Sequence, residues 1–204
     1  MPRTVATPSK KAFTFHPLTP DRWDDLVHLF GGRGACGGCW CMTWRLSRAE
    51  FDANKGDKNK RAFKKLVQKQ PPGILAYDGK DPVGWCAIAP REDYVRLAQH
   101  RTLKPIDDKP VWSITCLFVV KQYRRQKLST ALIDAAARWA KSQGARMVEG
   151  YPTEPGQTLP DPFIYTGVVA SFERAGFTEA KRTSATRAIM RKALVRTPHH
   201  GSES

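Results

Sequence analysis

The sequence LFVVKQYRRQKLST occupies residues 117–130 and indicates the end of a strand, a short basic turn and the start of a helix. The run from Val111 to Val120 is rich in β-branched and aromatic residues and is apolar on both faces, which predicts a central strand covered on both sides. Apolar residues then recur at helical spacing from Leu128 to Ala140, and Gly144 supplies a stop. A strand, turn and helix therefore form the centre of the expected fold.

The segments on either side of this unit alternate between strand and helix patterns. Ser47 with Glu50 forms a capping box, Thr19-Pro20 opens an earlier helix, and the turn chemistry of 78–81 joins two strands into a hairpin. We expect strands over residues 11–18, 74–77, 83–89, 145–151, 178–184 and 187–194, and helices over residues 19–30, from 47, over 58–70 and over 164–175. This order predicts a mixed α/β sheet with helices on both faces.

Length and composition predict one domain. The 204 residues are 41% hydrophobic, which suffices for a sizeable core. Residues 1–10 and 197–204 lack apolar periodicity, so we expect flexible tails around a domain spanning 11–196. No apolar run approaches the roughly 18 to 20 residues that span a bilayer, and the polar start does not read as a signal peptide. We therefore expect a cytoplasmic protein that does not enter a membrane.

The net charge of +15, from 34 basic and 19 acidic residues, indicates an anionic partner. Nucleic acid, a membrane surface and a phosphorylated cofactor all qualify, as does a basic surface with no dedicated role. Nucleic acid is the least favoured partner, because the chain lacks the interleaved exposed aromatics of a single-strand binder.

The start of the long helix is the candidate anion site. The first backbone N–H groups of a helix have no partner within it and lie at the positive end of its dipole. Four basic residues surround these groups, while Ser129 and Thr130 in the first turn leave room for a phosphate; the basic residues are Lys121, Arg124, Arg125 and Lys127. The pattern indicates a diphosphate site, and a solvated basic helix start is the alternative.

The same stretch resembles the GNAT superfamily of N-acetyltransferases. Val119 takes the place of the family's strand-ending valine, Arg124 opens its [Arg/Gln]-x-x-Gly-x-[Gly/Ala] pattern, and Ser129 takes the final small position. The segment from Phe172 to Phe177 is similar to the family's aromatic-x-x-x-Gly-Phe ending. The resemblance implies a GNAT-like α/β fold with a mixed, mostly antiparallel central sheet and acetyl-CoA as co-substrate. It assigns cofactor binding to Phe118, Val119, Val120, Arg124, Arg125, Gln126, Lys127, Leu128, Ser129 and Thr130.

The chain departs from the family pattern at two positions. Lys127 stands at the glycine, where its side chain would either crowd a phosphate or add a charge to it. Phe172 stands where relatives often carry a tyrosine that acts as general acid, so Tyr165 is the candidate substitute. These departures keep open an alternative, a catalytically silent acyl-CoA-binding or sensing module.

The mechanism that the resemblance implies is direct attack of a primary amine on the thioester in a ternary complex. Glu149 is the candidate base, with Glu92, Asp93 or a water chain as alternatives. A backbone N–H near Phe118 or Val119 would stabilise the oxyanion. The amine acceptor is not readable from the sequence, and a homodimer is compatible with it.

Three cysteines stand within six residues, at Cys36, Cys39 and Cys41. They would supply three zinc ligands, with His28 or Cys86 as a fourth, or a redox-active pair. Only one cluster is present and its context after a short helix does not match a redox motif, so packing is favoured and no metal is expected. The adjacent aromatic residues suggest that this segment lines the acceptor pocket.

Overall fold

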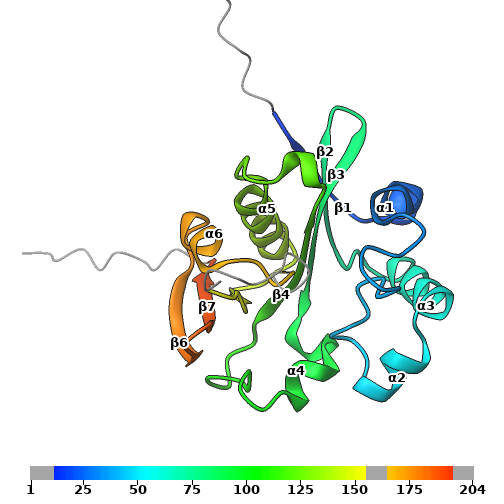
Figure 1. Cartoon of the computed structure of the whole chain (residues 1–204). Helices are drawn as coiled ribbons and strands as arrows, with labels where there is room; N and C mark the ends of the chain where they lie inside the picture. Colours follow the sequence, from blue (N-terminus) through cyan, green and yellow to red (C-terminus); the bar gives the residue numbers. More distant parts are fainter. Residues whose placement is uncertain (1–11, 155–164, 195–204) are drawn as a thin grey trace, which may run out of the picture.

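The computed structural model describes residues 12–154 and 165–194, which form a twisted sheet between two layers of helices (Figure 1). Seven strands are found in this part of the chain, in the order β1-β2-β3-β4-β5-β7-β6. All neighbouring pairs are antiparallel except β4 and β5, which are parallel. The strands are β1 Thr14–Pro17, β2 Gly73–Asp78, β3 Asp81–Pro90, β4 Trp112–Val119, β5 Met147–Gly150, β6 Thr178–Ser184 and β7 Arg187–Ala193. The expected mixed, mostly antiparallel sheet is confirmed.

Helices cover both faces of the sheet, as predicted. Figure 1 shows α5 and α6 on one face and α1 and α3 on the other. The helices are α1 Trp23–Phe30, α2 Arg48–Ala53, α3 Asp57–Val67, α4 Val95–Gln99, α5 Leu128–Ser142 and α6 Val169–Arg174. Within the described ranges, no helix is both long and apolar enough to cross a membrane.

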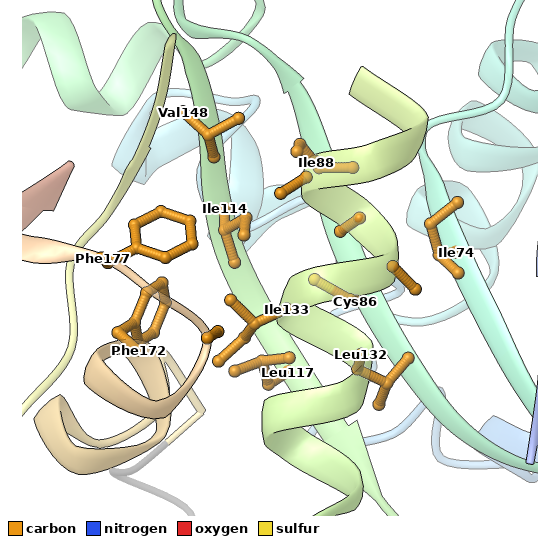
Figure 2. Packing of buried hydrophobic residues seen from close by; sticks show 14 of the residues in the cluster. Ile74, Cys86, Ile88, Ile114, Leu117, Leu132, Ile133, Val148, Phe172 and Phe177 are labelled. Atoms are coloured by element: carbon orange, nitrogen blue, oxygen red, sulfur yellow. The ribbon is translucent and has the colours of Figure 1, made fainter. Parts of the chain in front are cut away.

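The two faces of the sheet carry separate cores because side chains alternate along each strand. On β3, Cys86 and Ile88 face α5 in one core, whereas Trp85 faces α1 and α3 in the other. Figure 2 shows the first core, where Leu132 and Ile133 of α5 lie against the sheet. Burial on both faces explains why the central strands read as continuous apolar runs in the sequence.

Local signals placed most helix ends correctly. The capping box is formed, with the Ser47 N–H donating to Glu50 Oε2 at 3.0 Å and the Glu50 N–H donating to Ser47 Oγ at 3.3 Å. Gly31 ends α1 at a φ of 63°. Thr19 does not cap the helix with its side chain; Pro20 opens a 3₁₀ turn, and α1 itself begins at Trp23.

Two helical segments differ from expectation. The last helix begins at Val169, because Gly167 has a φ of 85° and Val168 is extended, and neither conformation continues a helix. Ile164, the predicted start, lies outside the described residues, as do the predicted tails at 1–10 and 197–204. The short helix α4 was not predicted, because its five residues are too few for a periodic pattern.

Candidate active site

Strand β4 and helix α5 meet at the basic turn, as the sequence indicates. A 3₁₀ turn over Lys121–Tyr123 follows the strand, and α5 begins at Leu128. Arg124 folds back so that its Nε donates to the Val119 carbonyl oxygen at 3.1 Å. This bond ties the turn to the end of the strand and keeps the guanidinium near the first turn of α5.

Two residues of the turn adopt the left-handed conformation that usually favours glycine. Arg125 and Lys127 both have a φ of 61°, and Lys127 is the N-cap residue of α5. A non-glycine residue in this region carries a cost of about 1 to 2 kcal/mol. Both side chains are exposed, so their charges lie at the surface beside the helix start.

A pocket of about 300 Å³ lies beside this helix start, and we call it the loop pocket. Four of the ten predicted cofactor residues line it: Phe118, Val119, Arg124 and Ser129. The other six do not: Val120 is half-buried, Leu128 belongs to the core, and Arg125, Gln126 and Lys127 are exposed. Thr130 is half-buried, and its Oγ1 has no hydrogen-bond partner among the described residues.

The loop pocket opens where β4 and β5 separate. Their pairing covers only Trp112–Ile114 of β4, which itself runs on to Val119. The Val120 N–H donates to Val83 on β3, so by alternation the N–H of Val119 points to the opposite edge, toward the separation. On the same edge, the Leu117 N–H donates to the Tyr165 carbonyl oxygen at 2.6 Å. Of the two predicted oxyanion donors, Val119 is therefore on the open edge and Phe118 faces β3.

A second pocket of about 290 Å³ lies next to the first, and we call it the thiol pocket. Its wall carries four cysteines: Cys36, Cys39 and Cys41 of the predicted cluster, and Cys116 of β4. The two pockets share five wall residues: Ala35, Cys36, Leu117, Phe118 and Tyr165. They therefore meet at the end of β4, where a group held in one lies next to a group held in the other.

The cysteine cluster lies in a series of tight turns. No group of three His, Cys, Asp or Glu residues in the described part of the chain is placed to hold a metal ion. Cys39 Sγ donates to the Gly34 carbonyl at 3.3 Å, and Trp85 Nε1 donates to Cys41 Sγ at 3.0 Å. Burial raises the pKa of Cys39 to about 11. A thiol with a raised pKa is a poor redox nucleophile.

Tyr165 lines both pockets, whereas Phe172 lines neither. Burial raises the pKa of Tyr165, which keeps its hydroxyl protonated and able to donate. Phe172 is fully buried, its ring lies 5.2 Å from that of Phe177, and it packs against Gly150 of β5.

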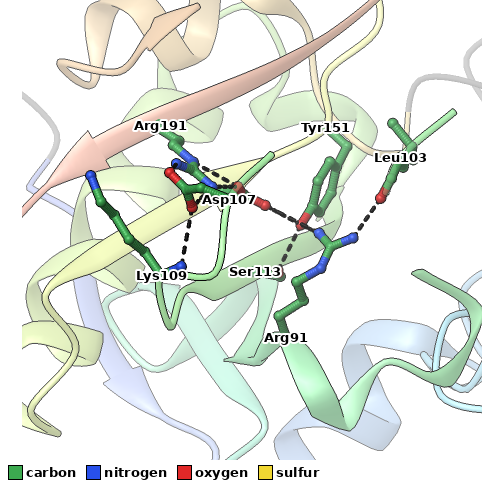
Figure 3. A network of polar contacts seen from close by, with 8 residues as sticks. Arg91, Leu103, Asp107, Lys109, Ser113, Tyr151 and Arg191 are labelled. Carbon is green, nitrogen blue, oxygen red and sulfur yellow. Dashed lines mark hydrogen bonds and ion pairs between the residues drawn. The ribbon is translucent and has the colours of Figure 1, made fainter. Parts of the chain in front are cut away.

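The predicted base Glu149 lies in a network of polar contacts, and Figure 3 shows its partners Arg91, Arg191 and Tyr151. It is 1% exposed, and its carboxylate pairs with Arg191 at 2.7 Å and Arg91 at 3.1 Å. The Tyr151 hydroxyl donates to it at 2.8 Å. It does not line either pocket, and neither do the alternatives Glu92, which is exposed, and Asp93, which pairs with Arg45.

Residues 40–156, more than half of the chain, match the model of the acetyltransferase (GNAT) family. The chain belongs to this family. The GNAT fold is also found in solved structures of low identity. An acetyltransferase of the GNAT family from Streptococcus pneumoniae is 13% identical, with a TM-score of 0.54, over 90% of this chain and 100% of that chain. An acetyltransferase of the GNAT family from Listeria monocytogenes is 13% identical, with a TM-score of 0.52, over 89% of this chain and 95% of that chain. No curated protein matched the sequence.

Membership makes this GNAT chain an acetyltransferase with acetyl-CoA as its co-substrate. The first turn of α5, with Arg124 and Ser129 beside it, fits the diphosphate of that molecule in charge and in donor groups. Several pocket residues were missed from the sequence, namely Thr43, Phe51, Lys55, Cys116, Gly167 and Ser171. Cys116 carried a signal because it lies on the central strand next to Leu117, and Thr43 carried one because it precedes Trp44 in the segment expected to line the acceptor pocket.

Proposed function

We propose that this chain transfers the acetyl group of acetyl-CoA to a primary amine by direct attack in a ternary complex. The observation that carries the proposal is the meeting of the loop pocket and the thiol pocket at Leu117, Phe118 and Tyr165. Two adjoining pockets let a thioester and an amine lie in contact, which replaces a collision in solution by a positioned encounter. The cytoplasmic location and a homodimer stay predictions.

In this proposal the loop pocket holds the co-substrate. The unpaired N–H groups of the first turn of α5 bind the diphosphate, and Arg124 and Ser129 supply a charge and a hydroxyl beside them. The Val119 N–H, on the open edge of β4, donates to the oxygen that gains negative charge. Bound acetyl-CoA supplies an activated thioester carbonyl.

Proton movement then depends on Tyr165. Its hydroxyl, held protonated by burial, donates to the sulfur that leaves as the new amide bond forms. None of the described residues lining the two pockets is a carboxylate or a histidine. The amine therefore arrives neutral or first releases its extra proton to water. The proton that nitrogen loses as the amide forms returns through water to Tyr165, and Glu149 is assigned a structural role.

A silent acyl-CoA-binding module remains the second candidate. Two observations favour it: Phe172 offers no hydroxyl, and the Leu117 N–H on the open edge is already bonded to Tyr165. This module would bind CoA without turnover on any amine, so one acceptor acetylated at an enzymatic rate rules it out.

Replacing Ser129 by glutamate tests the co-substrate site. A carboxylate in the first turn of α5 interacts favourably with the helix dipole, by about 0.3 to 1 kcal/mol, so the Tm should hold or rise. The same charge in the loop pocket repels the diphosphate, and CoA affinity measured by calorimetry should fall at least about tenfold.

Gln143→Glu is the matched control, because it adds the same charge at the exposed far end of α5. We expect CoA affinity to be unchanged in the control. If Ser129→Glu and the wild type bind CoA with equal affinity, the diphosphate does not bind at the start of α5.

A further inference from the structure

The thiol pocket has an unusual wall for a site that receives an amine. Flat apolar surface comes from Trp44, Phe51 and Phe118. Four cysteine thiols fill much of the remainder, and sulfur makes favourable contacts with aromatic rings. The wall therefore suits a flat aromatic body better than a flexible polar chain.

The charges around this pocket disfavour a cation. The titratable groups on its wall are Cys36, Cys39, Cys41, Cys116, Lys55 and Tyr165. Burial raises the pKa of Cys39 to about 11, and a hydrogen bond with Cys116 together with burial raises that of Cys41, so these two thiols carry no charge near neutral pH. Tyr165 is protonated for the same reason.

Lys55 is then the one formal charge on the wall among the described residues. Its Nζ lies 5.6 Å from the centre of the Phe51 ring and 2.8 Å from Asp52, a residue that does not line the pocket. An ammonium placed in the pocket would find no carboxylate among the described wall residues, and the only formal charge that these residues carry, Lys55, is already paired with Asp52. Desolvation without a carboxylate partner favours the neutral form of a bound amine.

The need to bind as the neutral form separates classes of amine by the fraction that is neutral at pH 7.4. About one in a thousand molecules of an alkylamine with a lysine-like pKa near 10.4 is neutral at pH 7.4. A weakly basic amine is neutral throughout and avoids that loss. Lysine side chains and polyamines are therefore the least suited acceptors for this pocket.

We propose that the thiol pocket takes, as acetyl acceptor, a weakly basic amine on a flat aromatic body, bound as the neutral free base. The proposal rests on the acetyl transfer proposed above, and it specifies the acceptor. The amine nitrogen bonds to the acetyl carbon, the bond from that carbon to sulfur breaks, and CoA leaves as the thiol. The proton lost by the amine balances the proton gained by sulfur.

The isomers 4-methylaniline and benzylamine test the proposal, with spermidine as a cationic alkylamine. The full chain is given acetyl-CoA and each amine at pH 7.4. Acetylated product is measured by chromatography, because the exposed Cys36 would react with disulfide reagents for thiol release. We expect kcat/KM for 4-methylaniline to exceed that for benzylamine at least tenfold, with no turnover of spermidine.

A pH series on the unmodified chain checks the same point without a variant. Between pH 6 and 8.5, kcat/KM for benzylamine should rise about tenfold per pH unit, because its neutral fraction does. The value for 4-methylaniline should stay nearly flat. A preference for benzylamine or spermidine at pH 7.4 overturns the acceptor class but leaves acetyl transfer intact, whereas no product from any amine overturns both.

A charge placed in the wall should reverse the preference. Thr43→Asp adds a carboxylate to the thiol pocket, and Thr43→Asn is its neutral, equally sized control. We expect the ratio of kcat/KM for 4-methylaniline to that for benzylamine to fall at least tenfold in the aspartate variant and to stay within about threefold of the wild type in the asparagine variant. An unchanged ratio in a folded Thr43→Asp protein would contradict the proposal.

Discussion

Replacing Glu149 by glutamine should unfold this protein more easily without removing its chemistry. Glu149 was the candidate base from sequence, but its carboxylate accepts from Arg91, Arg191 and Tyr151 and lies outside both pockets. Through these contacts it joins the 3₁₀ turn Arg91–Asp93, β5 and β7. Figure 3 shows the partner residues Arg91, Arg191 and Tyr151. The change removes one charge from the centre of a buried ionic network.

The loss of stability in Glu149→Gln depends on the hydrogen bonds that Arg91 and Arg191 retain. Removing one partner of a buried ion pair costs about 3 to 5 kcal/mol. Arg91 retains the Leu103 carbonyl and the Tyr151 hydroxyl, and Arg191 retains two bonds to Asp107, so neither is left without a partner. We therefore expect the lower end, about 3 kcal/mol, which lowers the Tm by about 6 to 12 °C in a chain of this length.

Thermal denaturation and steady-state kinetics on the folded fraction separate the two roles. A structural role predicts the lower Tm with kcat within about threefold of the wild type. A role as general base predicts an unchanged Tm and a kcat about 100-fold lower or more, since a general base contributes at least that factor to the rate. An unchanged Tm with a 100-fold loss of kcat would refute the structural assignment. Asp107→Asn is the control, because it removes only the more exposed partner of Arg191 and should lower the Tm less.

Three further changes test the fold around the site. Gly150→Ala should lower the free energy of unfolding, measured by urea titration, by about 1 to 3 kcal/mol, because the added Cβ would lie 2.0 Å from Cε1 of Phe172. An unchanged urea midpoint would show that the Phe172 ring can move aside. The free energy of unfolding should fall as pH rises from 9.0, the ordinary pKa of the Cys39 thiol, toward its folded pKa of about 11, because the folded state keeps a proton that the unfolded state releases. The urea midpoints measured at pH 8 and pH 10 should therefore differ less in Cys39→Ala than in the wild type. An equal difference in the two proteins would contradict this. Lys127→Gly should keep the Tm within about 3 °C of the wild-type value, because glycine relieves the strain of the left-handed backbone but also gives the unfolded chain more conformational freedom. A drop of more than about 6 °C would contradict this balance.

Local patterns decided most of the fold. The capping box at Ser47, the glycine at position 31 and the apolar stripe of α5 act within a few residues, so they can be read in order along the chain. The strand, turn and helix around Arg124 are likewise a local unit, and the loop pocket lies beside it. The start of α6 was misplaced, because the turn at Gly167 interrupts an apolar run that looks helical.

Only the tertiary structure decided how distant segments meet. The sequence could not show that Cys36 and Cys116 line one pocket, because they lie on a loop and on β4 and their proximity depends on packing across the sheet. It could not show that Glu149 is held by two arginines from separate segments, since those ion pairs form between residues 58 and 42 positions apart. Spacing along the chain sets which elements form, whereas burial and pairing between elements set which side chains face a substrate.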